Sequence, residues 1–237
     1  MRISIIGFGQ VGKTLARRFT KLGHRVSIAH SKGPESITDC AHEMGATAVS
    51  VLEAAKVGEI VVVSIPTKAV VDLPKGLFAE GASDVVVVDT SNYHPDLRDG
   101  HIKEIDQGMP ESQWVARQIG RPVIKAFNMI FATSLSEKAL PKGSRGRIAL
   151  SVAGNSADSK ALVFRLIDDL GFDPVDCGTL ENSWRQQTGT PAYCKDLEAT
   201  ALQFALEAAD YDRVAEYRSG EEARIKKEMA AKKTSGK

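Results

Sequence analysis

A glycine-rich stretch near the N-terminus limits the folds open to this chain more than any other feature. The stretch IIGFGQVGKTLARRF, residues 5–19, satisfies Gly7-x-Gly9-x-x-Gly12, the dinucleotide-binding fingerprint. It also satisfies G-x-x-x-x-G-K-T, the P-loop of nucleoside triphosphatases. Both patterns need glycine because backbone N–H groups must approach a phosphate at the N-terminus of a helix. The stretch therefore predicts a strand–loop–helix unit that binds either a dinucleotide or ATP.

Short β-branched runs alternate with helical patterns over most of the chain. Several of these runs are continuously apolar, as expected of parallel strands that are buried on both faces. The alternation predicts an α/β fold, a doubly wound parallel sheet of the NAD(P)-binding Rossmann type. The predicted strands are 2–7, 25–30, 59–66, 84–91, 122–128 and 147–154, and the predicted helices are 12–22, about 34–44, 68–80, 110–120 and 158–170.

The pattern changes after about residue 180. The segment GTLENSWRQQTGTPAYCKDL is polar and predicts an ordered loop, and the chain from Asp196 to about Lys233 is rich in strong helix formers. We therefore expect a Rossmann domain over 1–180, followed over 181–237 by a loop and a helical C-terminal extension. An apolar stripe on that extension needs a surface to cover it, so we expect it to pack on a second copy in a two-fold homodimer. The stripe consists of Leu202, Ala205, Leu206 and Ala209.

Features beyond the three glycines separate the two phosphate-binding patterns. Ala16 permits close packing of the helix on the sheet, and Gly23 can end the helix before the second strand; a P-loop needs neither. The run VVVVD, ending at Asp89, resembles a Walker-B strand, but a buried strand ending in Asp is common in doubly wound sheets. The dinucleotide is favoured, which makes Lys13 and Thr14 ordinary first-turn helix residues. A P-loop NTPase remains the more distant alternative.

The end of the second predicted strand indicates which dinucleotide is bound. In a Rossmann fold this position faces the adenosine ribose, and an NAD site places Asp or Glu there. Here the sequence is HSKGPES, with Ser31 and Lys32 and no carboxylate until Glu35. A hydroxyl and an ammonium suit a 2′-phosphate, so we expect NADP(H) as the cofactor.

Five stretches carry a resemblance to a known family: GFGQVG, HSKGPES, VVVSIP, VIKAFNMIFA and LGFDPVDCGTLENSWRQQ. In these stretches, which cover most of residues 1–190, the sequence resembles the NADP-binding proteins grouped with deazaflavin (coenzyme F420)-dependent NADP oxidoreductase. That family also includes the cytosolic domains of membrane ferric reductases. Its specificity loop usually carries Ser-Arg. Ser31-Lys32 keeps the positive charge, but lysine cannot form the bidentate hydrogen bonds of an arginine guanidinium group. The long C-terminal helix departs from the deazaflavin enzyme.

The resemblance also implies where the cofactor lies. It places Asn92 and Asn128 near the nicotinamide ribose and the hydride acceptor, with Asn128 as the candidate for acceptor positioning. Judged from the residues alone, either amide could instead cap a turn. The cofactor contacts that the resemblance implies are Gly7, Phe8, Gly9, Gln10, Val11, Gly12, Ser31, Lys32, Ser64, Ile65, Pro66, Asn92, Asn128 and Ala132.

The predicted strand ends lack an obvious general acid. They offer Ser64, Asn92 and Asn128, and we interpret Asp89 as an anchor for its own loop. Reduction of a carbonyl needs a proton donor, whereas a flavin-like ring needs alignment with the nicotinamide. We therefore expect an NADPH-dependent oxidoreductase acting on a planar acceptor such as a flavin or deazaflavin, without one indispensable catalytic side chain. An NADPH-binding sensor or scaffold is the alternative.

Other residues with chemical potential support no second kind of site. The segment DTSNYHPDLRDGHIKEID holds two histidines and several carboxylates without the tight spacing of a metal site, so we expect a solvated loop and no metal. Trp184 and Tyr193 could stack on a planar acceptor or pack in the core. Cys194 is expected to be a small buried hydrophobe.

Composition excludes several partners. A formal net charge of +1 gives no reason to expect nucleic acid or an anionic membrane. Three widely spaced cysteines fit a reduced cytoplasm better than a disulfide framework. No apolar run reaches the roughly 18 residues that a membrane helix needs. We expect a cytoplasmic protein whose partners are a small-molecule hydride acceptor and a second copy of itself.

Overall fold

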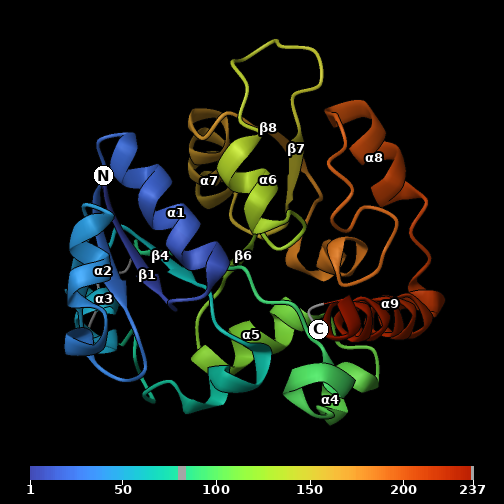
Figure 1. Cartoon of the computed structure of the whole chain (residues 1–237), viewed down its shortest axis with the longest axis horizontal. Helices are drawn as coiled ribbons and strands as arrows, with labels where there is room; N and C mark the ends of the chain where they lie inside the picture. Colours follow the sequence, from blue (N-terminus) through green and yellow to red (C-terminus); the bar gives the residue numbers. More distant parts are fainter. Residues whose placement is uncertain (80–83, 236–237) are drawn as a thin grey trace.

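A six-stranded parallel sheet forms the centre of the computed structural model, which describes residues 1–79 and 84–235 (Figure 1). The strand order is β3-β2-β1-β4-β5-β6, so the direction of winding reverses between β1 and β4. In such a sheet the crevice beyond the carboxyl ends of the two strands at the reversal is where ligands bind. The expected Rossmann fold is confirmed. The strands are β1 (Arg2–Ile6), β2 (Arg25–Ala29), β3 (Thr47–Val49), β4 (Ile60–Val63), β5 (Val86–Asp89) and β6 (Ile124–Lys125).

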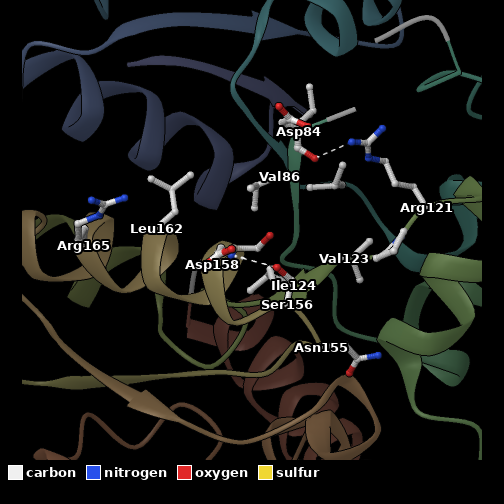
Figure 2. A pocket seen from close by; sticks show the side chains of 14 residues that line it. Asp84, Val86, Arg121, Val123, Ile124, Asn155, Ser156, Asp158, Leu162 and Arg165 are labelled. Atoms are coloured by element: carbon white, nitrogen blue, oxygen red, sulfur yellow. Dashed lines mark hydrogen bonds between the residues drawn. The ribbon is translucent and has the colours of Figure 1, made fainter. Parts of the chain in front are cut away.

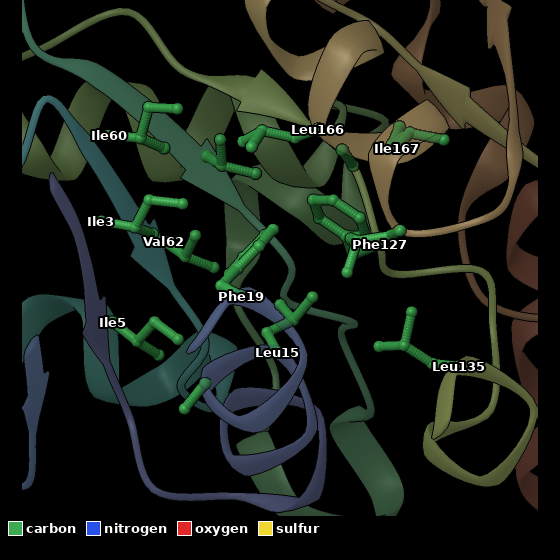
Figure 3. Close-up of a cluster of buried hydrophobic side chains, with 14 of the residues drawn as sticks. Ile3, Ile5, Leu15, Phe19, Ile60, Val62, Phe127, Leu135, Leu166 and Ile167 are labelled. Atoms are coloured by element: carbon green, nitrogen blue, oxygen red, sulfur yellow. The ribbon is translucent and has the colours of Figure 1, made fainter. Parts of the chain in front are cut away.

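Helices cover both faces of this sheet, which explains the continuously apolar strands. On one face Ile3, Ile5 and Val62 meet Leu15 and Phe19 from α1 (Gln10–Lys21), as Figure 3 shows. The opposite face packs on α3 (Val51–Val57) and α5 (Glu111–Ile119). The shorter helical elements are η1 (Pro34–Ser36), α2 (Thr38–Glu43), η2 (Thr67–Asp72), η3 (Pro95–Asp99), α4 (Lys103–Asp106) and α6 (Ala132–Glu137).

The last predicted strand does not join the main sheet. Instead β7 (Ala149–Val152) pairs in parallel with β8 (Asp173–Asp176), and α7 (Ala157–Asp169) connects the two. A single antiparallel bridge between Lys125 and Ala153 links this small sheet to β6, with N–H···O distances of 2.8 and 3.0 Å. The expected extension of the parallel sheet by residues 147–154 is therefore wrong, because the chain reverses direction after β6.

The C-terminal part covers the small sheet. The segment expected to be a loop begins with η4 (Leu180–Gln186), and the expected long helix is divided into α8 (Ala199–Glu207), η5 (Tyr211–Arg213) and α9 (Val214–Ser235). Leu202 and Leu206 of the apolar stripe are buried in one cluster with Ala149 of β7. The stripe thus packs on its own chain, and the expectation that it packs on a second copy is wrong.

Two smaller features of the sequence-based model can be compared with the structure. The helix predicted over 68–80 is only the short η2, and residue 80 lies outside the described residues. Among the described residues, no helix combines the length and the apolar character needed to cross a membrane.

Candidate functional site

A cleft of about 630 Å³ opens at the reversal of the strand order, beyond the carboxyl ends of β1, β2 and β4. Half of the predicted cofactor contacts line it, and they come from three separate loops. These are Gly7, Phe8, Gly9, Ser31, Ser64, Ile65 and Pro66. The other lining residues were not among the predicted contacts; they are Ile6, Ala29, His30, Val51, Ala69, Asp72, Leu73 and Pro74.

The fingerprint glycines have two different roles in this cleft. Gly7 has φ +125°, and a Cβ there would lie 2.1 Å from the Ser64 carbonyl oxygen. A Cβ on Gly12 would lie 2.4 Å from the Gly7 carbonyl oxygen. These two positions hold the loop tightly between β4 and α1. Gly9, in contrast, has no heavy atom within 4 Å of an added Cβ, so its backbone is open to an approaching ligand.

The N-terminus of α1 points a set of unpaired donors toward the same space. The helix begins at Gln10, its N-cap Gly9 has no side-chain cap, and no acidic residue occupies the first turn. The first N–H groups of a helix have no intrahelical partner and attract anions. Gln10, Val11 and Gly12 belong to this turn and do not line the cleft themselves.

The same geometry argues against a P-loop. In a P-loop the lysine reaches the phosphates and the following hydroxyl binds Mg²⁺. Here the N–H of Lys13 bonds to the Gly9 carbonyl at 3.0 Å, and its Nζ lies 5.4 Å from the centre of the Phe8 ring. Thr14 is buried. Because α1 begins two residues earlier than the predicted helix 12–22, Lys13 and Thr14 are its fourth and fifth residues, at the end of the first turn.

The loop after β2 presents the predicted specificity residues. Ser31 and Lys32 are exposed, and the Lys32 side chain forms no hydrogen bond or ion pair with the described residues. The loop is closed behind them, since Ser36 Oγ lies 3.0 Å from His30 Nδ1 and donates to the Gly33 carbonyl at 2.7 Å. Lys32 thus follows Ser31, which lines the cleft, on a hydrogen-bonded loop, and its ammonium has no ion-pair partner among the described residues.

Asn92 and Asn128 meet at the carboxyl ends of β5 and β6. Asn92 Nδ2 donates to the Asn128 carbonyl at 2.9 Å, and Asn128 Nδ2 donates to Asn92 Oδ1 at 3.1 Å and to the Gln186 carbonyl at 2.7 Å. Asn128 is only 2% exposed, whereas Asn92 is partly exposed. The pair joins two strand ends to η4, and Asn92 is the member that a ligand can reach.

Phe127 and Ala132 lie close to Asn128 in the sequence. Phe127, directly before Asn128, is buried and has φ +62°, a left-handed conformation that costs a non-glycine residue on the order of 1–3 kcal/mol. Backbone strain of this kind gathers at functional sites. Ala132, the last predicted contact, begins the short helix α6 and is partly exposed, outside the cleft.

A buried ion pair that the sequence reasoning missed supports the loop carrying Asn92. Lys125 Nζ lies 3.1 Å from Asp89 Oδ2, and both side chains are fully buried. The other oxygen of Asp89 accepts from the Ser91 N–H at 2.9 Å, and Lys125 Nζ donates to the Ser91 carbonyl. Asp89 therefore anchors its loop, as expected. A lysine inside the apolar run VIKAF was the available signal for its partner.

The segment expected to be a solvated charged loop is partly packed against the rest of the protein. Asp99 is buried and accepts hydrogen bonds from the N–H groups of Lys68 at 3.2 Å and His94 at 2.8 Å. Glu222 of α9 accepts from the Asp96 N–H at 3.2 Å. The expectation of a solvated loop is therefore wrong for Asp99, whereas Asp96, His101, Glu104 and Asp106 of the same segment are exposed as expected. Among the described residues, no group of three His, Cys, Asp or Glu side chains is arranged to bind a metal.

The aromatic residues and Cys194 have different environments. Tyr193 lies in the same buried cluster as the apolar stripe, and burial raises the pKa of its hydroxyl. Burial also raises the pKa of the Cys194 thiol to about 12, which leaves no thiolate for nucleophilic chemistry. Trp184 lines a separate cavity with Tyr211, whose ring centre lies 5.2 Å away. Neither Trp184 nor Tyr193 lines the cleft.

A second groove, of about 680 Å³, lies at the opposite edge of the sheet (Figure 2). Val86 and Ile124, the first residues of β5 and β6, lie in it with Leu162 of α7. Because ligands of doubly wound sheets bind at the carboxyl ends of the strands, the cleft at Gly7–Gly9 is the candidate site.

Comparison with known proteins agrees with this geometry. Residues 2–93 match the family model described as NADP oxidoreductase coenzyme F420-dependent. Over 70 residues the sequence is 47% identical to protein YjhV of Escherichia coli, a match that covers 30% of this chain and 51% of that protein. The chain thus matches about half the length of this curated relative.

Solved structures extend the similarity beyond residue 93. The hypothetical protein SMa0349 from Sinorhizobium meliloti has a TM-score of 0.70 at 31% identity, covering 84% of this chain and 95% of that one. A candidate F420-dependent NADP reductase from an Arthrobacter species has a TM-score of 0.59 at 24% identity, covering 76% and 86%. The second comparison shows the fold alone. Residues 2–93 thus match the family of coenzyme F420-dependent NADP oxidoreductases, whose cofactor is NADP(H).

Proposed function

We propose that this chain binds NADP(H) in the cleft at Gly7–Gly9 and transfers a hydride between that cofactor and a planar acceptor such as a flavin or deazaflavin. The observation that carries the proposal is the uncapped N-terminus of α1 beside the open backbone of Gly9. A pyrophosphate fits there, because the free N–H groups and the helix dipole both favour negative charge. Bound NADPH would supply the hydride.

The residues around the cleft suggest how the cofactor is held. The N–H groups at Gly9 and Gln10 bind the pyrophosphate, and Lys32 binds the 2′-phosphate with Ser31 beside it. The Ser64–Pro66 turn forms the wall after β4. Since Pro66 has a fixed φ and no N–H donor, this turn supplies a firm apolar surface without competing for hydrogen bonds.

The chain's contribution to the chemical step is alignment. His30 lines the cleft at the end of β2, where the adenosine ribose is expected. At the ends of β5 and β6 the titratable side chains are Asp89 and Lys125, which are fully buried and paired with each other. Neither can donate a proton to a bound substrate. Asn92 can offer an amide donor and acceptor to the nicotinamide end of the cofactor without changing its charge. This favours an acceptor ring that delocalises charge and takes its proton from water.

A binding titration tests the first half of the proposal. The protein is titrated with NADPH, NADH and Mg-ATP, with the binding heat measured for each. We expect NADPH to bind about ten- to a hundredfold tighter than NADH, because Lys32 forms a charge-assisted hydrogen bond to the 2′-phosphate. Mg-ATP is expected to bind weakly. Equal affinities for NADH and NADPH, or preferential binding of Mg-ATP, would contradict the proposal.

One observation favours a second function, that of an NADPH-binding sensor or scaffold. The buried side chains of Asn128, Asp89 and Lys125 bind other parts of the protein, which is also what a structural platform requires. The two functions differ in one property. A sensor binds NADPH without oxidising it, whatever acceptor is supplied.

A further inference from the structure

The wall of the cleft facing away from α1 differs in character from the phosphate-binding loop. It is built by Val51 at the start of α3 and by Ala69, Leu73 and Pro74 in and after η2. Val51 and Leu73 pack against the apolar cluster on the sheet face opposite α1. An apolar wall of this kind suits a flat base, and the donors at Gly9 and Gln10 suit phosphate.

One carboxylate interrupts this apolar wall. Asp72, the last residue of η2, lies between Ala69 and Leu73 and is, among the described residues, the one acidic residue lining the cleft. It is exposed, and it forms no hydrogen bond or ion pair with any residue in the described part of the chain. The Asp72 carboxylate therefore stabilises no contact within the described part of the chain.

The ligand's chemistry limits what Asp72 can do. Every phosphate of NADP(H) repels a carboxylate, so an acid facing one would weaken binding. A carboxylate accepts hydrogen bonds and donates none. The hydrogen-bond donor on an adenine ring is its exocyclic amino group. If the base packs on the wall of Val51, Ala69 and Leu73, this amino group lies beside Asp72.

We propose that Asp72 is a specificity residue that selects adenine by accepting a hydrogen bond from the exocyclic amino group of the base. This inference rests on the proposed function, because it takes the ligand of the cleft to be NADP(H). It adds a second point of selection to Lys32. Lys32 distinguishes the phosphorylated from the unphosphorylated ribose, and Asp72 distinguishes an amino-substituted purine from an oxo-substituted one.

The test compares NADPH with its hypoxanthine analogue, in which a carbonyl oxygen replaces the exocyclic amino group. Affinities of both are measured for the unmodified protein, Asp72→Ala and Asp72→Asn. The unmodified protein should bind NADPH about three- to tenfold tighter than the analogue, since the hydrogen bond is to a charged but solvent-exposed group. Asp72→Ala should bind the two equally. Asp72→Asn, which can donate to the carbonyl oxygen, should favour the analogue.

Asp169→Ala is the matched control. Asp169 is exposed at the end of α7 and lies outside the cleft, so removing its charge should leave the preference for adenine unchanged. Equal binding of the two dinucleotides by the unmodified protein would overturn the assignment. So would an equal loss of affinity for both in Asp72→Ala, which would indicate a contact with the ribose. Failure of the unmodified protein to bind NADPH would instead overturn the proposed function.

Discussion

At the scale of single residues, the candidate site depends on which side chains are absent and which are held in place. Gly7 and Gly12 allow close backbone contacts, while Gly9 leaves space for a ligand. Lys32 is exposed and has no protein partner in the described chain, whereas Asp89 and Lys125 are buried against each other. Of these charged side chains, Lys32 is therefore the one that can bind a ligand.

The clearest residue-scale prediction concerns Lys32. Lys32→Asp should weaken NADPH binding by about ten- to a hundredfold and narrow the gap with NADH, because a like charge then faces the 2′-phosphate. Titration of both cofactors into both proteins measures the effect. Lys21→Asp, an exposed lysine at the end of α1, serves as the control and should change neither affinity. An unchanged ratio of the two affinities in Lys32→Asp would contradict this role.

Asn128 gives a second residue-scale prediction. Asn128→Ala removes the donors to Asn92 Oδ1 and the Gln186 carbonyl, so it should destabilise the fold by about 1–3 kcal/mol. Because Asn128 acts through Asn92, NADPH oxidation should slow by about one to two orders of magnitude at most. Single-turnover kinetics and urea denaturation measure the two effects. Complete loss of activity with intact NADPH binding would assign Asn128 a direct catalytic role.

The sequence predicted the backbone of the site better than its side-chain network. The spacing of Gly7, Gly9 and Gly12 fixes a loop that few other sequences form, so their roles were predictable. The neighbours of Lys125 and Asp72 depend on which strands and turns come together in space. A lysine inside the apolar run VIKAF indicates a buried charge that needs a partner, but the sequence does not show which carboxylate that partner is or which cleft Asp72 lines.

At the scale of elements, strands with apolar runs were predictable and short edge strands were not. β3 has three residues and is partly exposed, and β8 has the sequence DPVD, so neither shows the apolar pattern of a buried strand. The division between α8 and α9 also has a local cause. Asp210 caps a new turn by accepting from the Asp212 N–H at 3.0 Å. The sequence from Asp196 to about Lys233 is rich in strong helix formers, so it predicts one continuous helix and does not predict this division.

The contact between α9 and the loop after β5 provides a prediction about pH. His94 lies in that loop, and burial, with the nearby Arg98, lowers its pKa to about 4. Asp99, Glu221, Glu222 and Arg218 are the other charged groups around it. Because the folded state keeps His94 neutral, its contribution to stability is fully present above pH 6.5 and is lost as the pH falls toward 4.

Urea denaturation at several pH values checks this behaviour. The unmodified protein should lose on the order of 2–3 kcal/mol between pH 6.5 and pH 4 through His94, at about 1.4 kcal/mol for each unit of pKa shift. His94→Gln should lose correspondingly less over the same interval. His42→Gln, on the exposed surface of α2, is the control and should follow the unmodified protein. Identical pH profiles for the unmodified protein and His94→Gln would contradict the assignment.

At the scale of the whole molecule, the question is whether the chain functions as a dimer. The stripe at Leu202 and Leu206 is covered by its own chain, but the outer face of α8 carries the exposed side chains of Ala201, Phe204 and Ala208. Phe204 is 67% exposed. A helix that is apolar on two opposite faces is typical of a buried helix, so we still expect a homodimer, now through this outer face.

Light scattering at micromolar concentration tests that expectation. The unmodified protein should have the mass of a dimer, and Phe204→Glu should have the mass of a monomer, because the introduced charge would be buried without a partner. Gln203→Glu, an exposed neighbour on the same helix, controls for the added charge. A monomeric mass for the unmodified protein would exclude the dimer.

The most direct test of the central claim is single-turnover oxidation of bound NADPH, followed by nicotinamide absorbance after rapid mixing with a flavin or deazaflavin. At the ends of β5 and β6, Asp89 and Lys125 are buried against each other and cannot protonate a substrate, while the cleft at Gly7–Gly9 is suited to NADP(H), so hydride transfer should occur to these planar rings and not to a simple aldehyde or ketone. Oxidation of NADPH by the planar acceptor, at a rate that depends on its concentration, is the predicted result. Efficient turnover of a simple carbonyl, or no oxidation by any planar acceptor although NADPH is bound, would contradict the account.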